Sequence, residues 1–370
     1  MTFFSLNEIN TLLIWEMYLS KLKNILPRAV VKHSYARFGS SATKKEETVT
    51  LEFCRKAPKV ELHAHLHGCI RPSTLQEYLT EKNVKYTPEE FKTKDMKGAF
   101  RIFDLIHAAI DNLKQIDRIS EELFEDFAKE NVVYLELRST PRHLGSNTAD
   151  DYVALLLDKI AKFEQKQSQM KIRLLLSVSR AEDIEKARET LALAKKYKSS
   201  GYILGIDYSG NPFQKTFTYF QEVFQEARDS NLKTVVHCAE LPDEKTLQET
   251  YDVLKFKPDR VGHFNYFNDE LFNTIHELNI PIEMCPTSNK FTMYLKDYHD
   301  HHFIKYYKTK HPLCLCTDDT VVFDTNISEE YYRMLKAFNF TEEQAKEVIK
   351  RSYECVFDEK IKQELRQISL

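Results

Sequence analysis

Two histidines that follow a short apolar run are the first residues whose spacing could support chemistry. The run Val60–Leu62 favours a strand, and His63 and His65 come directly after it and two apart. Residues two apart in a strand point to the same face, so both imidazoles can reach one point in space. Such a pair could hold a metal ion such as zinc. Alone, the same pair could also be two solvent-facing histidines at a strand end, so the metal interpretation depends on other clusters.

The elements that must position these residues alternate along the chain. Short apolar, β-branched runs predict eight strands, at residues 60–63, 132–137, 172–178, 203–207, 234–237, 260–263, 280–285 and 313–317. Amphipathic stretches between them predict helices, which makes the strands parallel, and eight parallel strands close a barrel. We therefore predict an α/β fold, a (β/α)8 TIM barrel. Roughly 70 residues separate the first two strands, far more than a usual βα loop, so we expect extra helices there as a cap over the barrel mouth, and further helices at the C-terminus.

Polar residues gather where these strands end, which is where barrel enzymes carry their chemistry. His237 ends the fifth strand, His263 ends the sixth, and Asp318 and Asp319 follow the eighth. One such histidine, or one Asp-Asp pair, is commonly structural. Together with the first pair they supply three imidazoles and a carboxylate, a set suited to Zn²⁺ with one position left for water.

Composition narrows the class of protein. The chain has 370 residues, a net charge of -3, 42% hydrophobic and 29% charged residues. We expect no attraction to nucleic acid or to anionic membranes, and no apolar run is long enough to span a bilayer. The seven cysteines are scattered without a CxxC pair, which indicates a reducing compartment and favours the cytoplasm.

The N-terminal residues 1–50 differ from the rest. Residues 17–45 hold seven basic residues and no acidic one, as in a mitochondrial transit peptide. Glu8 and Glu16 argue against that, unless translation starts at Met17. The alternative is a disordered, dispensable extension. In either case we expect residues 51–370 to form a single metal-dependent barrel domain.

An ordered set of motifs resembles the adenosine deaminase family, a zinc-dependent branch of the amidohydrolase barrels. The motifs are HAHLHG at 63–68, GIDYSGNP at 205–212, HCAE at 237–240, RVGH at 260–263, CPTSN at 285–289 and CTDD at 316–319. The phrase YLELRSTPR at 134–142 is similar to the adenosine deaminase-like branch, which removes the alkylamine from N6-methyl-AMP to give IMP. The resemblance covers about residues 50–370.

The resemblance assigns roles to individual residues. It implies one zinc ion per chain, a general acid/base and a second catalytic histidine, with Asp319 bonded to purine N7 and Gly210 near N3. The implied metal ligands are His63, His65, His237 and Asp318, and the implied catalytic residues are Glu240 and His263. The implied substrate contacts are His65, His67, His107, Ser139, Thr140, Pro141, Arg142, Ser179, Gly210 and Asp319.

Three positions depart from the family pattern. His67 stands where the branch usually has Asn and adenosine deaminase has Asp, Phe264 where the family usually has Gly, and Ser179 where the branch often has Asp. These departures bear on substrate preference and rate more than on reaction class. By charge, a histidine at 67 suits a 5′-phosphate better than a carboxylate would.

We therefore expect a hydrolase of cyclic amidine C–N bonds that acts at C6 of an aminopurine nucleotide. The expected reaction is N6-methyl-AMP plus water to IMP plus methylamine, by a monomer whose partner is its small-molecule substrate. The strand-six histidine His263 could orient the attacking water or deprotonate it. No lysine lies in residues 201–212, which argues against a carbamylated-lysine bridge between two metals, and the cytidine deaminase signature is absent. The alternatives are adenosine deamination to inosine, a hydrolase of a non-purine substrate, and a non-catalytic purine-binding barrel, for which loss of a ligand or of Glu240 would be expected.

Overall fold

The computed structural model describes residues 48–91, 96–167 and 169–370. The chain divides into two units between Lys45 and Glu46, and every described residue belongs to the second unit. Most of the expected N-terminal extension, with the basic stretch 17–45, therefore lies outside the described residues.

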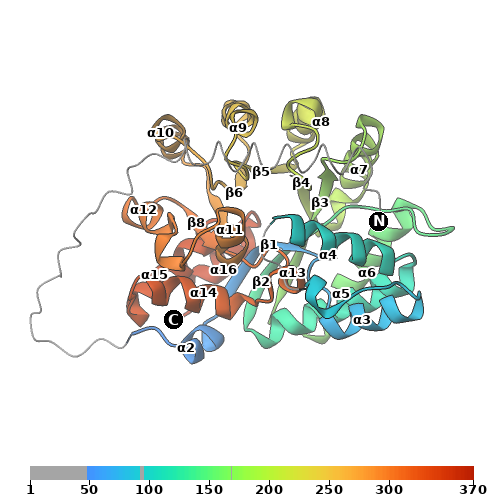
Figure 1. Ribbon diagram of the computed structural model, residues 1–370, viewed down its shortest axis with the longest axis horizontal. Coiled ribbons are helices and arrows are strands. Elements are labelled where there is room, and N and C mark those ends of the chain that lie inside the picture. The colour runs from blue at the N-terminus through green and yellow to red at the C-terminus, as the bar shows by residue number, and fades with distance from the viewer. Residues whose placement is uncertain (1–47, 92–95, 168) are drawn as a thin grey trace, which may run out of the picture. The chain divides into compact units, whose positions relative to one another are not determined.

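Eight parallel strands form one sheet in the order β1 to β8 (Figure 1). The strands are β1 Lys59–His65, β2 Val132–Ser139, β3 Lys171–Ser179, β4 Ile203–Ser209, β5 Lys233–Cys238, β6 Arg260–His263, β7 Ile282–Met284 and β8 Leu313–Leu315. The sheet closes on itself because Ala64 of β1 pairs with Asp318, just beyond β8. The predicted (β/α)8 barrel is confirmed.

Helices lie between the strands and after the last one. They are α2 Leu51–Lys56, α3 Pro72–Glu81, α4 Met96–Ala109, α5 Leu113–Lys129, α6 Ala149–Lys166, α7 Ile184–Tyr197, α8 Phe217–Asp229, α9 Glu244–Phe256, α10 Asp269–Leu278, α11 Pro286–Thr292, α12 Phe303–Lys308, α13 Thr320–Phe323, α14 Ile327–Ala337, α15 Glu342–Glu354 and α16 Glu359–Arg366. Short 3₁₀ turns occur at Pro88–Phe91, Lys198–Ser200 and Tyr298–Asp300. Several long helices begin at side-chain caps, such as the capping boxes of Thr148 before α6 and Thr341 before α15.

The segment between β1 and β2 holds α3, α4 and α5. Helix α4 packs against α13, which begins directly after Asp319. This places α4, and with it His107, beside the strand ends that carry the predicted site. The arrangement agrees with the expected cap.

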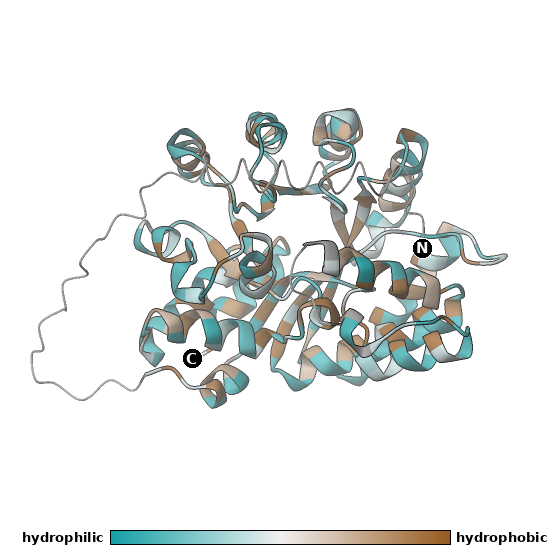
Figure 2. Cartoon of the chain, in the orientation of Figure 1, coloured by the Kyte–Doolittle hydropathy of each residue, from teal (hydrophilic) through white to brown (hydrophobic). Residues whose placement is uncertain are grey.

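The strands are buried on both faces, as parallel strands covered by helices should be. In Figure 2 the strands are largely hydrophobic, while the outer faces of the helices are hydrophilic. Yet Glu136, Arg138, Arg260 and Glu283 lie within these strands and are fully buried. Buried charges must be paired, and these four are paired with one another and with the site described below. Within the described part of the chain, no helix has the length and apolarity to span a bilayer.

Candidate active site

Four histidines and an aspartate meet at the carboxyl ends of β1, β5, β6 and β8. The backbone itself joins the first and last of these strands at the site. The N–H of Asp318 donates to the carbonyl of His63 at 2.8 Å, and the N–H of His65 donates to the carbonyl of Asp318 at 3.2 Å. Residues from the two ends of the barrel sequence are thereby fixed side by side.

Four of the six distances between donor atoms of the predicted metal ligands lie near the spacing of a tetrahedral site. Nε2 of His65 lies 3.3 Å from Nε2 of His63 and 3.3 Å from Nε2 of His237. Oδ1 of Asp318 lies 3.4 Å from Nε2 of His63 and 3.5 Å from Nε2 of His65. Ligands about 2.0–2.1 Å from a tetrahedral zinc ion are separated by roughly 3.3–3.4 Å. The side chains therefore fit a zinc ion where they stand.

His263 lies close to the same centre but fits the metal set less well. It forms a buried group with His63, His237 and Asp318 in which all ligand atoms lie within 4.8 Å of one another. Its Nε2 is 3.9 Å from Oδ2 of Asp318, which is wider than a tetrahedral edge. The shorter distances favour His65 as the fourth ligand and leave His263 facing the centre from one side.

Buried carboxylates contact the outer nitrogens of two of these imidazoles. Nδ1 of His63 lies 2.8 Å from Oε2 of Glu283, and Nδ1 of His237 lies 3.1 Å from Oδ1 of Asp207. Arg138 joins the two carboxylates, since its guanidinium contacts Asp207 at 3.1 Å and also Glu283. At His63 the Glu283 carboxylate accepts from Nδ1–H, which leaves the Nε2 lone pair free for a metal ion.

Sequence reasoning did not assign Glu283, Asp207 or Arg138 to the site. The available signal was an ionisable residue inside an apolar strand run, as in IPIEMC at 280–285. Such a residue is rarely buried without a partner. The identity of the partner requires the strand register, which the sequence did not give.

The protonation of the ligand histidines suits a metal ion. Burial lowers the pKa of His65 to about 4 and the pKa of His237 well below its ordinary value, so both offer lone pairs at neutral pH. Burial also lowers the pKa of His63, but the hydrogen bonds to Asp318 and Glu283 outweigh it and the net shift is upward. Those carboxylates favour positive charge at His63, which a bound cation supplies as well as a proton does.

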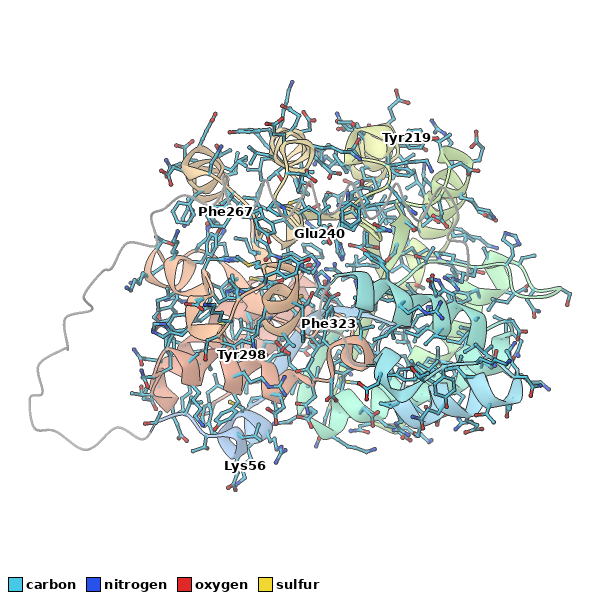
Figure 3. The ribbon with its side chains drawn as sticks, viewed as in Figure 1. Lys56, Tyr219, Glu240, Phe267, Tyr298 and Phe323 are labelled. Atoms are coloured by element: carbon cyan, nitrogen blue, oxygen red, sulfur yellow. The ribbon has the colours of Figure 1, made fainter. Side chains whose placement is uncertain are left out.

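Glu240, labelled in Figure 3, follows β5 and is buried. It lies within electrostatic reach of His263 and Asp318. Burial raises its pKa and the charge of Arg180 lowers it, with a net rise. Arg180, which sequence reasoning missed, donates to Oε1 of Glu240 at 3.0 Å and also binds Glu249 at 3.0 Å. Glu240 is therefore held in place and is more readily protonated than an ordinary glutamate.

The backbone at these strand ends is in the left-handed region. Ala239, His263, Phe264 and Asp318 have φ angles of 56°, 65°, 50° and 64°. Such angles are costly for bulky residues and concentrate at functional sites. At Phe264, where the family usually has glycine, the ring is buried and stacks on Phe267 at 5.4 Å, which lies between α10 and α12 (Figure 3).

A second group of basic side chains comes from the end of β1, from α4 and from the loop after β2. The ring of His67 lies 6.2 Å from that of His107 and stacks at 6.4 Å on Tyr152. Burial lowers the pKa of both histidines, to about 4 for His107, and the charge of the nearby Arg142 contributes to the shift. Nε2 of His67 is buried, and no described residue forms a hydrogen bond with it.

The neighbouring predicted contacts have different environments. The hydroxyl of Ser139 is bonded to Tyr152 at 2.6 Å and is therefore already engaged. Thr140 and Pro141 carry the chain from Ser139 to Arg142, with Pro141 buried.

Ser179 ends β3, and Gly210 directly follows the neighbouring strand β4. A Cβ atom at Gly210 would lie 3.1 Å from the Ser179 hydroxyl, and Gly210 has a φ of 104° that favours glycine. The structure thus brings together these two predicted contacts from adjacent strand ends.

Asp319 occupies space that only a glycine at position 68 leaves open. A Cβ atom at Gly68 would lie 1.6 Å from Oδ1 of Asp319. That oxygen is buried and has no hydrogen-bond partner among the described residues, and burial together with the charge of Asp318 raises the pKa of Asp319. The carboxyl group is free to bind a ligand, and Gly68 is a site residue that sequence reasoning did not identify.

Comparison with known proteins places this site in a family. The family model described as adenosine deaminase matches residues 58–368. The N6-mAMP deaminase of Arabidopsis thaliana is 36% identical over 350 residues, covering 86% of this chain and 98% of that protein. The human N6-methyl-AMP deaminase is 32% identical over 340 residues, covering 87% and 95%.

A solved structure has the same fold. The crystal structure of Arabidopsis ADAL complexed with IMP is 36% identical, covers 85% of this chain and 96% of that chain, and superimposes with a TM-score of 0.79. The predicted resemblance and the predicted enzyme class, a hydrolytic deaminase, are confirmed. The chain forms the barrel, carries the strand-end histidines and matches the family model over most of its length. It therefore belongs to the adenosine deaminase family.

Proposed function

We propose that this chain hydrolyses N6-methyl-AMP to IMP and methylamine, and that it does so with one zinc ion per chain held by His63, His65, His237 and Asp318. The observation that carries the substrate assignment is the basic group of Arg142, His67 and His107 beside the predicted metal centre. The binding of IMP by the Arabidopsis relative supports it, because IMP is the product of the proposed reaction.

A zinc ion bound by these four side chains would supply a hydroxide-like nucleophile near neutral pH. Glu240 in its protonated form donates to purine N1, which makes C6 electrophilic, and its raised pKa favours that form. Water adds to C6 and returns one proton to the Glu240 carboxylate. The C6 adduct passes its remaining hydroxyl proton to the amine as the C6–N bond breaks, so that C6 becomes a carbonyl and methylamine leaves. Asp319 binds N7, and its buried Oδ1, which has no hydrogen-bond partner among the described residues, supports this role.

The phosphate subsite follows from charge and hydrogen-bonding capacity. Arg142 carries the permanent positive charge of the basic group, and it forms no ion pair with any described residue. His67 and His107 are held neutral by burial and by Arg142, so they act as hydrogen-bond donors. A guanidinium offers a phosphate two parallel donors together with charge.

The test compares two substrates that differ only in the phosphate, N6-methyl-AMP and N6-methyladenosine. Arg142→Ala should lower kcat/KM for the nucleotide by about 10- to 100-fold, since a hydrogen bond to a charged group contributes about 1.5–3 kcal/mol. It should leave kcat/KM for the nucleoside unchanged.

His143→Ala is the matched control. His143 is the next residue in the same loop, but its side chain is exposed and pairs with Glu189 at 2.9 Å. The proposal is wrong if adenosine or N6-methyladenosine is the better substrate of the wild type, or if Arg142→Ala lowers both substrates equally. Metal analysis of the same preparation should give about one zinc per chain, and two equivalents would overturn the single-metal site.

A further inference from the structure

Asn289 lies between the catalytic histidine and a second buried histidine. It belongs to α11 and has no exposed surface. As placed, Oδ1 of its side-chain amide lies 3.2 Å from Nδ1 of His263, and Nδ2 lies 3.3 Å from Nε2 of His301. The oxygen and the NH₂ group of an amide exchange places by a half-turn about Cβ–Cγ, so their hydrogen-bond partners decide the orientation.

The hydrogen bond at Nδ1 of His301 decides which orientation the Asn289 amide takes. The backbone N–H of Phe303, at the start of α12, donates to Nδ1 of His301 at 3.0 Å. A backbone N–H can only donate, so Nδ1 carries no proton. His301 is 1% exposed and burial lowers its pKa to about 3, which keeps it neutral. Its single proton therefore lies on Nε2 and points at Asn289.

We infer that Asn289 turns its oxygen to His301 and its NH₂ group to His263, and that His263 therefore keeps its proton on Nε2, toward the catalytic centre. In the opposite orientation, Nε2–H of His301 would face the NH₂ group of Asn289, two donors in contact. The chain of hydrogen bonds thus runs from the Phe303 backbone through His301 and Asn289 to Nδ1 of His263. Asn289 and His301 are positioning residues, because they act only through His263.

The consequence separates the two roles that the sequence left open for His263. When Nδ1 of the single-protonated ring is an acceptor, His263 presents an N–H at Nε2, the atom that lies 3.9 Å from Oδ2 of Asp318. It can orient the attacking oxygen and stabilise the negative charge that develops there, but it has no lone pair with which to take a proton from water. This consequence rests on the proposed function, whereas the position of the proton does not.

The position of the proton can be measured without substrate. In metal-loaded protein with ¹⁵N-labelled histidine, long-range imidazole spectra distinguish the Nε2–H from the Nδ1–H tautomer, and His263→Gln identifies the signal of His263. We expect the Nε2–H form. The Nδ1–H form would overturn the inference, whatever the substrate of the enzyme proves to be, so this result and the substrate assignment fail independently.

Substitutions test the chain of hydrogen bonds. Asn289→Asp places an acceptor against Nδ1 and should shift His263 to the Nδ1–H form. The loss of one donor to developing charge typically lowers kcat by ~10²–10³-fold, and KM and metal content should change little.

Asn265→Asp is the control, because Asn265 is a similarly buried amide that binds Thr292 and not His263. It should leave the tautomer of His263 as in the wild type. A merely structural role for Asn289 would lower thermal stability in both variants and shift the tautomer in neither, which would overturn the inference. If Asn289→Asp does not fold, His301→Phe tests the same chain of hydrogen bonds, because phenylalanine fills the space of the ring without nitrogen atoms. It should give a mixture of both tautomers of His263. A pure Nε2–H form of His263 in this variant would show that His301 does not determine the position of the proton.

Discussion

Glu283 has two tasks that a pair of substitutions can separate. Its carboxylate accepts from Nδ1 of His63 at 2.8 Å, and it also binds Arg138 and, at 2.7 Å, Arg260. The first contact supports a predicted metal ligand, and the other two hold the barrel strands together. Glu283→Gln keeps the shape of the side chain and removes its charge. We expect it to weaken both metal binding and folding.

The magnitudes follow from what each partner retains. Breaking a buried ion pair typically costs about 3–5 kcal/mol, and the lower end applies here because Arg138 keeps Asp207 and Arg260 keeps Glu136. Removing the carboxylate behind a ligand histidine typically weakens metal binding about 10- to 100-fold. Glutamine can still accept the proton of His63 Nδ1 through its oxygen, so we expect a loss of about 10-fold.

Glu136→Gln is the matched control. Glu136 is equally buried and pairs with the same Arg260, but its other contacts are the Tyr134 hydroxyl and the Phe357 N–H. Both substitutions should lower the free energy of unfolding of metal-free protein, measured by denaturant titration. Only Glu283→Gln should raise the metal dissociation constant, measured by competition with a chromophoric chelator under conditions where both variants are folded. An equal loss of metal affinity in the two variants would show that metal affinity depends on barrel stability and not on the contact with His63. No loss in either variant would show that Glu283 does not support metal binding.

Four further changes should have distinct effects. Glu240→Gln should keep its metal and lower kcat by ~10²–10⁴-fold, because an amide cannot donate the acid proton; turnover within a few-fold of wild type would exclude that role. Arg180→Gln removes the charge that opposes burial at Glu240, so the pKa of Glu240 should rise further and the alkaline limit of kcat should move to higher pH; an unchanged pH profile would contradict this. Gly68→Ala puts a Cβ atom 1.6 Å from Oδ1 of Asp319 and should lower kcat/KM by ~10²-fold without loss of metal, whereas normal kcat/KM would show that Asp319 does not bind substrate in this position. Burial lowers the pKa of His311 from 6.5 to about 4, so between these pH values the unfolded chain binds a proton that the folded chain does not bind. The free energy of unfolding should therefore fall by up to about 1.4 kcal/mol per pH unit as the pH drops through that range. His311→Gln should lose this part of the pH dependence, and an unchanged dependence would refute the prediction.

The fold was predictable because its signals are local. Each barrel strand is an apolar run between amphipathic stretches, and strong caps such as Thr148 and Thr341 mark helix starts. The short helices α2, α11, α12 and α13 have four to seven residues, too few for a periodic pattern to predict them. Strands β7 and β8 end earlier than predicted, because Pro286 starts a helix after one and the backbone turns into the site after the other.

The candidate site was predictable only in part. The ligand-type residues could be named because they stand at strand ends in recognisable motifs. Arg180, Glu283 and Asn289 could not be given roles, because each acts through a partner that is distant in sequence: Arg180 through Glu240, Glu283 through His63, and Asn289 through His263 and His301. The identity of such a partner depends on strand register and side-chain rotamer, and neither can be predicted from a single sequence.

The same contacts close the barrel and set the spacing of the predicted metal ligands. β8 is short, and beyond it the seam with β1 is completed by a side chain: Glu61 accepts from the N–H of His63 at 2.8 Å and from the N–H and hydroxyl of Thr317 at 3.0 and 2.9 Å. Thr317 precedes Asp318, whose own N–H binds the carbonyl of His63. The carboxylate of Glu61 thus fixes the spacing between a histidine from the first strand and the aspartate after the last. A barrel that failed to close at this seam would also lose the spacing between the predicted ligands His63 and Asp318, which connects the buried Glu61 of β1 to the predicted metal site.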